Sequence, residues 1–404
     1  MGMIIDKQLE HFLKATWESP VFGDTFPKAH GRSRLAWARR QLADIAAAIA
    51  PELIEKVSAG MPELDRRSVE KIVSGEIIPK TLAFCPALTI GELNDIPRLS
   101  AVAVAVGLMY WGDQTLDRGD TAMAEAIMLL GSSNAQAEAK VSKKARLRYG
   151  ALRHIQEKTD ALARPEDAPF VLACFYDQVL HNEVAMQKLS LDYVVSDKAP
   201  AFLTKHGRRV AEITTVSAGF PSISSSLYAI YRQHEPSLPP LAEIYGNPAM
   251  TNLLQTCNVV VRLWDELGDW MMDSGYDPRK GEFVINPFNQ YDSSCVQRFC
   301  ELAFIADAGQ VAAIQQAFAG FHDSEAARQE HGAYILKTLR DHIRHYMKNL
   351  PAAIRTDFEL YIRLCKRVME IGYVNRIGDI NLSKDSPADN ALTNSRTTQG
   401  RFLF

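Results

Sequence analysis

Two groups of aspartates, far apart in the sequence, have a spacing that suits metal ligands on helices. Asp113 and Asp117 lie four residues apart at the end of an apolar run, and Asp120 joins them if the helix continues past Gly119. Residues four apart project from one face of a helix. Carboxylates at the end of a buried helix are costly unless something neutralises them, and the helix dipole adds to that cost. Hard cations such as Mg²⁺, which prefer oxygen ligands, would relieve the conflict.

The second group has the same spacing within a later apolar stretch. Asp265, Asp269 and Asp273 form one stripe over two helical turns, among tryptophans and methionines. Like charges at this spacing repel in an isolated helix, and a metal ion held between them would reverse the sign of that interaction. Together, the two groups predict two facing helices that bind divalent cations. The expected metal ligands are Asp113, Asp117, Asp265, Asp269 and Asp273. The alternative for the first group is a helix end at the surface, whose aspartates cap the next turn. The alternative for the second group is an exposed acidic helix face.

The composition points to a soluble cytoplasmic protein. The net charge of −3 gives no support to binding of nucleic acid or of an anionic membrane. The six cysteines include no CxxC pair, which argues against a zinc site or a redox dithiol. The N-terminus lacks the pattern of a secretory signal, and the longest apolar run, residues 101–111, is too short to span a bilayer.

Apolar residues recur at three- and four-residue spacing along most of the chain, which predicts helices separated by Gly- and Pro-containing stretches such as that at Pro51. The predicted helices cover residues 35–49, 99–116, 122–130, 168–189, 202–216, 250–272, 296–306, 312–321, 325–349 and 352–373. Strand-like alternation with Asn-Gly turns is absent from the sequence. We therefore expect an all-α protein. Its helical core domain spans 81–380, with an N-terminal helical segment packing on it over 1–80 and a polar tail or lid over 381–404.

At its acidic groups the chain resembles the class I terpene synthases. That family carries an aspartate-rich motif, usually Asp-Asp-x-x-Asp, on one helix. On a facing helix it carries (Asn/Asp)-Asp-(Leu/Ile/Val)-x-(Ser/Thr)-x-x-x-Glu. Here the first motif reads Asp113-Gln-Thr-Leu-Asp117, and the second reads Asp265-Glu-Leu-Gly-Asp-Trp-Met-Met-Asp273. The spacing of the second motif is kept, and the aspartates that replace its Ser/Thr and Glu remain oxygen ligands.

The resemblance also suggests residues that bind diphosphate. The family has an arginine upstream of the second motif, followed by a helix break, and here Arg209 precedes Pro221, which removes a backbone donor and frees a carbonyl. Basic side chains suit phosphate oxygens. The expected diphosphate-binding residues are Arg208, Arg209, Arg262, Lys280 and Arg376.

The resemblance implies a helical bundle with a central active-site cavity, in a monomer or homodimer, and a carbon–oxygen lyase that acts on a phosphate ester. In the family three Mg²⁺ ions, for which Mn²⁺ can substitute, bridge the acidic helices and the substrate diphosphate. The expected substrate is a linear prenyl diphosphate, here farnesyl diphosphate, and the expected product is a sesquiterpene hydrocarbon of the humulene type. Aromatic rings stabilise cations, and the candidate rings are those of Tyr110, Trp111, Phe84, Phe175, Phe220, Trp264 and Trp270. The expected catalytic residues are Asp113, Asp117, Arg209, Tyr110 and Trp111.

Two other interpretations remain open. Head-to-head synthases of the squalene or phytoene type also face two Asp-x-x-x-Asp helices across a helical cavity, and chain-elongating prenyl synthases use related motifs. The alternative from a different class is a non-catalytic helical binding protein that keeps the fold without the reaction.

Overall fold

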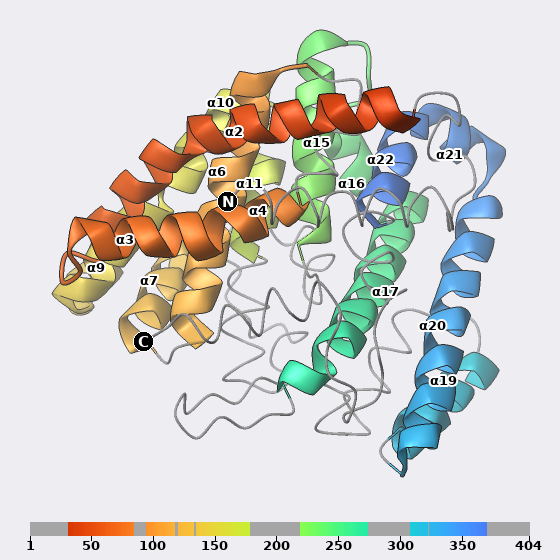
Figure 1. Ribbon diagram of the computed structural model, residues 1–404. Helices are drawn as coiled ribbons and strands as arrows, with labels where there is room; N and C mark the ends of the chain where they lie inside the picture. Colours follow the sequence, from red (N-terminus) through yellow and green to blue (C-terminus); the bar gives the residue numbers. More distant parts are fainter. Residues whose placement is uncertain are drawn as a thin grey trace.

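The computed structural model of the chain describes residues 31–84, 94–117, 120–132, 135–177, 219–273, 308–321 and 323–369. Within some helices, including residues 263–273 of the second acidic stretch, the backbone alone is described. Every element in the described ranges is a helix, and no strand occurs in them, which confirms the predicted all-α class (Figure 1). No helix in this part of the chain combines the length and the apolar character needed to cross a membrane.

The helices follow one another in the order shown by the colours of Figure 1. They are α2 (Gly31–Gly60), α3 (Arg66–Ile72), the π-helical turn η2 (Val73–Ile77), α4 (Ile78–Phe84), α6 (Ile96–Asp117), α7 (Thr121–Ser132), α8 (Ala135–Lys140), α9 (Lys143–Leu152), α10 (His154–Leu162), α11 (Ala168–Asp177), α15 (Phe220–His234), α16 (Leu241–Gly246), α17 (Pro248–Asp273), α19 (Ala308–Gly320), α20 (Glu325–Lys348), α21 (Ala352–Asp357) and α22 (Glu359–Met369).

The first long helix, α2, continues through a proline. The prediction that Pro51 separates two elements is wrong, because Pro51 lies inside α2 with its ring exposed. An internal proline costs about 3 kcal/mol. Burial of Ile49, Leu53 and Val57, each with no exposed surface, contributes about 1.5–3 kcal/mol per side chain and outweighs that cost. Helix α2 packs against α6 and α9.

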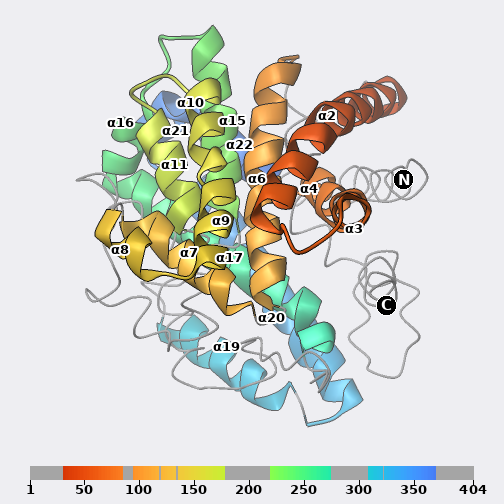
Figure 2. The ribbon, with the colours of Figure 1, turned by 90° about the vertical axis from the view of Figure 1, so that its left-hand side faces the viewer.

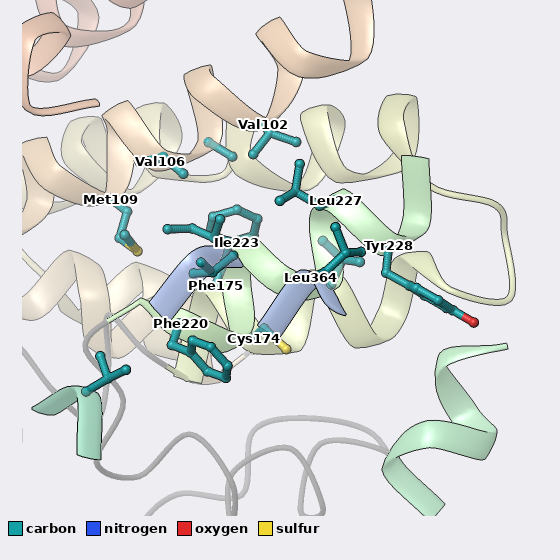
Figure 3. Packing of buried hydrophobic residues seen from close by; sticks show 14 of the residues in the cluster. Val102, Val106, Met109, Cys174, Phe175, Phe220, Ile223, Leu227, Tyr228 and Leu364 are labelled. Carbon is teal, nitrogen blue, oxygen red and sulfur yellow. The ribbon is translucent and has the colours of Figure 1, made fainter. Parts of the chain in front are cut away.

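Helix α15 contacts α6, α10, α11, α17 and α22. Side chains from these helices, from α2 and from α4 form one continuous hydrophobic core. Figure 3 shows part of this core, with labelled residues from α6 (Val102, Val106, Met109), α11 (Cys174, Phe175), α15 (Phe220, Ile223, Leu227, Tyr228) and α22 (Leu364). The core thus connects α2, from the predicted N-terminal segment, and α4, which spans the predicted boundary at residue 80, with the later helices. The domain boundaries remain a prediction, and residues 381–404 lie outside the described part.

At the predicted helix break, Pro221 lies at the start of α15, and the residues before Gly219 lie outside the described part. Gly219 precedes this helix with φ of 100°, a left-handed conformation that suits glycine. Pro221 lies in the first turn, where a missing N–H costs nothing because that donor has no partner within the helix. The helix itself was not predicted, because serines interrupt the apolar pattern of its buried side.

The buried serines of α15 are satisfied by hydrogen bonds. The hydroxyl of Ser222 donates to the carbonyl of Cys174 at 3.1 Å, and that of Ser224 donates to the carbonyl of Phe220 at 2.8 Å. Ser226 donates to the Ser222 carbonyl within the helix at 2.5 Å. Buried hydroxyls with partners cost little, so a serine-rich helix can occupy the centre of the core.

One buried ion pair joins the end of α15 to the start of α11. Asp167, with no exposed surface, accepts a hydrogen bond from the Arg232 guanidinium, whose side chain is also buried. Its other oxygen accepts from the backbone N–H of Leu241 at 2.9 Å, at the start of α16. Both charges are therefore paired and hydrogen-bonded, as buried charges must be.

Most of the other helices predicted from the sequence are observed in the described residues. Those at 99–116, 122–130, 250–272, 312–321 and 325–349 are confirmed as α6, α7, α17, α19 and α20, whereas the one at 352–373 is divided into α21 and α22 at Phe358. The helix at 168–189 is described as far as Asp177, and those at 202–216 and 296–306 lie outside the described residues.

Candidate functional site

The two helices that carry the aspartates end on the same side of the molecule. Both α6 and α17 run toward the lower side of the assembly in Figure 1, and they do so again in the rotated view of Figure 2. Helix α15 contacts both of them. The structure therefore brings the C-terminal ends of these two helices to one side, although they are distant in the sequence.

The acidic end of α6 is where this buried helix becomes accessible. Residues 101–109 are all buried, whereas Tyr110, Asp113 and Gln114 are partly exposed. These three positions fall on one side of the helix at three- and four-residue spacing. The backbone of Asp117 completes the last turn of α6, and its side chain lies outside the described residues. Asp113 thus has a carboxylate that a ligand can reach.

Trp111, an expected catalytic residue, packs against the end of α2. Its side chain is 1% exposed, and its indole N–H donates to the sulfur of Met61 at 3.4 Å. A Cβ atom added to Gly60 would lie 2.4 Å from Cη2 of the indole ring, so the glycine permits this close contact. The catalytic role of Trp111 stays a prediction, and its observed role is to join α6 to α2.

Asp120 does not continue the first acidic stripe, because α6 ends at Asp117 and a new helix begins at Thr121. The backbone N–H of Asp120 donates to the carbonyl of Thr115 at 3.3 Å, which closes the end of α6. Its carboxylate accepts from the N–H of Met123 at 3.1 Å and so caps the start of α7. Asp120 is thus a corner residue between two helices.

A fully buried arginine, Arg148 of α9, organises this corner. Its Nη2 atom donates to carboxylate oxygens of Asp120 and Glu63, at 2.9 Å each, and Nη1 donates to the carbonyl of Gly60. The ammonium of Lys144 lies 2.9 Å from the same Asp120 oxygen. Burial acts to raise the pKa of Asp120, but these cations outweigh it and hold the pKa below its ordinary value. Sequence reasoning missed Arg148, which lies in a basic stretch that does not distinguish it from its neighbours.

The second acidic group lies on the last three turns of α17. The backbone is helical through Asp273, whereas the side chains of Asp265, Asp269 and Asp273 lie outside the described residues. Upstream, Asn258 is fully buried and Arg262 is partly exposed. Arg262 is thus a partly exposed basic residue one turn before Asp265, although its Nε atom is buried.

The remaining predicted site residues divide into two sets. Phe175 and Phe220 are fully buried in the core (Figure 3). The side chains of Phe84, Trp264 and Trp270 and all of Arg208, Arg209, Lys280 and Arg376 lie outside the described residues.

A buried polar cluster beside α15 is a further group of potentially reactive side chains in the described part. Ser225 Oγ lies 2.8 Å from the hydroxyl of Tyr245 and 3.0 Å from that of Tyr361, and Cys174 Sγ lies 3.0 Å from the Tyr245 hydroxyl. Burial raises the pKa of Tyr245 well above its ordinary value. A protonated, fully buried group is a poor nucleophile, so this cluster serves packing and hydrogen bonding.

Among the side chains that the structure describes, no three His, Cys, Asp or Glu residues lie close enough to hold a metal ion together. Of the five predicted metal ligands, Asp113 alone has a described side chain. No family model, curated protein or solved structure matches the chain.

Proposed function

We propose that this chain is a Mg²⁺-dependent terpene cyclase of class I, with the helical bundle and central active-site cavity of that fold. It ionises a linear prenyl diphosphate, with farnesyl diphosphate as the first substrate to test, and it forms a cyclic sesquiterpene and free diphosphate. The observation that carries the proposal is that α6 and α17, whose last turns bear the aspartates, end on one side of the molecule and both pack on α15.

The donor chemistry of this side fits Mg²⁺. The Asp113 carboxylate is partly exposed, and the other proposed ligands, Asp117, Asp265, Asp269 and Asp273, are carboxylates at one-turn spacing. Carboxylate oxygens are the ligands that Mg²⁺ prefers, with its other positions left to water and phosphate oxygens. When bound, Mg²⁺ would supply Lewis-acid neutralisation of the diphosphate leaving group.

Arg262 is the proposed diphosphate-binding residue whose side chain is described. It is partly exposed and one turn before Asp265 on α17, so a diphosphate held by the aspartates would lie near this arginine. Arginine suits this role because its planar donors match phosphate oxygens. Arg208, Arg209, Lys280 and Arg376 remain proposed contacts to the same group.

The reaction breaks the bond between the allylic carbon and the diphosphate oxygen, and the electron pair leaves with the oxygen. The cation that remains must be kept from water. Helix α6 supports this because the acidic turn at Asp113 follows directly after a wholly buried apolar stretch that includes Val102, Val106 and Met109 (Figure 3). The acidic turn and the apolar stretch of α6 are thus adjacent, which suits a substrate that has a charged diphosphate and an apolar chain.

The test is incubation of the purified chain with farnesyl or geranylgeranyl diphosphate and Mg²⁺, with and without isopentenyl diphosphate, the co-substrate that chain elongation requires. Diphosphate release and products by mass spectrometry are both measured. Asp113→Asn and Asp265→Asn keep side-chain size but remove a charge, and each should abolish turnover with the helical circular dichroism retained. Asp44→Asn, on an exposed side of α2, is the matched control and should leave turnover unchanged.

The outcomes separate the possible functions. A cyclic hydrocarbon identifies a cyclase, whereas a longer or dimeric prenyl diphosphate identifies a prenyl synthase. No diphosphate release by the unmodified chain identifies a non-catalytic binding protein. Near-normal product formation by Asp113→Asn would refute the metal-binding role of this residue.

A further inference from the structure

We infer that the contact between the buried Arg148 and the partly exposed Asp120 is a positioning device for the acidic end of α6, and that Asp120 itself is not a metal ligand. The inference rests on the proposed function, since it assigns residues that act through Asp113. Its basis is the corner formed by the end of α2, the end of α6 and the start of α7, against which α9 packs.

Asp120 is already neutralised. One of its carboxylate oxygens lies 2.9 Å from both the Arg148 guanidinium and the Lys144 ammonium. The other accepts from the N–H of Met123 at 3.1 Å. A carboxylate paired with two cations attracts a further cation weakly, and a bound metal would have to displace contacts that also cap α7. The pattern of aspartates suggested a third ligand, and the observed partners argue against one.

Arg148 holds three segments at fixed positions. Its guanidinium donates to the Gly60 carbonyl at the end of α2, to Glu63 in the turn that follows, and to Asp120. The group is planar, and its donors point in set directions, so its partners are held at defined angles. A lysine would supply the same charge without that geometry.

Two contacts transmit this arrangement to Asp113. The N–H of Asp120 donates to the Thr115 carbonyl in the last turns of α6, at 3.3 Å. On the other side, the Trp111 ring lies against Gly60, the residue whose carbonyl Arg148 binds. The stretch between Trp111 and Thr115, which contains Asp113, is thus held from both ends by one corner.

The experiment compares Asp120→Asn and Arg148→Lys with the unmodified chain. Arg146→Lys is the matched control, because Arg146 lies on the same helix with an exposed side chain. Mn²⁺ binding is measured by electron paramagnetic resonance and calorimetry, and kcat is measured as a function of Mg²⁺ concentration. We expect the number of bound Mn²⁺ ions to stay the same while their affinity falls about 10–100-fold, the usual effect of residues that orient metal ligands. Saturating Mg²⁺ should restore most of kcat, which a general loss of folded protein would not allow.

Each result decides the matter. If Asp120→Asn removes a bound ion, as Asp113→Asn is expected to do, Asp120 is a ligand and the inference is wrong. If neither variant changes the affinity, the corner positions nothing, and the proposed function still stands. If the unmodified chain binds no Mn²⁺, the proposed function fails and this inference fails with it. Should Arg148→Lys not fold, Asp120→Asn decides alone, since asparagine keeps an oxygen for the N–H of Met123.

Discussion

Replacing Gly60 by alanine tests how closely α2 and α6 are packed beside the acidic site. An added Cβ would lie 2.4 Å from Cη2 and 2.8 Å from Cζ2 of Trp111. Carbon atoms in contact normally lie about 3.5–4.0 Å apart, and the ring is buried, so it has little room to move. Insertion of a methyl group into a closely packed core costs about 1–3 kcal/mol.

The same change at Gly150 supplies the control. Gly150 is helical and exposed in α9, and a Cβ there would meet no atom within 4 Å. Replacing glycine by alanine in a helix gains up to about 1 kcal/mol, so Gly150→Ala should be stabilising. Gly60→Ala has at most the same gain and bears the steric cost in addition. The free energies of unfolding of the two variants should therefore differ by about 1–3 kcal/mol.

The assay is urea unfolding followed by circular dichroism for both variants, repeated for Gly60→Ala in a Trp111→Phe background. The smaller ring lacks the atoms nearest to the added methyl group, so most of the steric cost should disappear there. Equal stability of Gly60→Ala and Gly150→Ala would refute the close contact. So would an unchanged cost of Gly60→Ala in the Trp111→Phe background.

Two further predictions concern the buried ion pairs. Asp167→Asn leaves the buried Arg232 without its countercharge. The free energy of unfolding, measured by urea unfolding, should therefore fall by about 3–5 kcal/mol. A loss below about 1 kcal/mol would contradict a stabilising role of the pair. The pKa of Asp120 is lowered in the folded chain, mainly by Arg148 against the effect of burial, so its charge stabilises the fold above the ordinary Asp pKa of about 4. That contribution is lost as pH falls through the lowered value. Unfolding measured between about pH 2 and pH 7 should therefore show Asp120→Asn less stable than the unmodified chain at neutral pH and equally stable at the acid end.

Local pattern predicted the helices that matter most for the site. Helices α6 and α17 were expected within a few residues of their observed bounds, because their apolar stretches are long and continuous. Helices α9 and α15 were missed, since the first is rich in basic residues and the second has serines on its buried side. The prediction at Pro51 was wrong because burial on both sides of a proline, a tertiary effect, outweighed a local signal.

The sequence by itself determined that the chain is helical and that aspartates occupy the last turns of two helices, because spacing along a helix is a local property. The tertiary structure alone decided what each charged residue does. Asp113 and Asp120 look alike in the sequence, yet the first is accessible and the second is paired with Arg148. The partners of Arg148 come from segments distant in the chain, and spacing within one segment carries no information about contacts that form only when separate helices pack together.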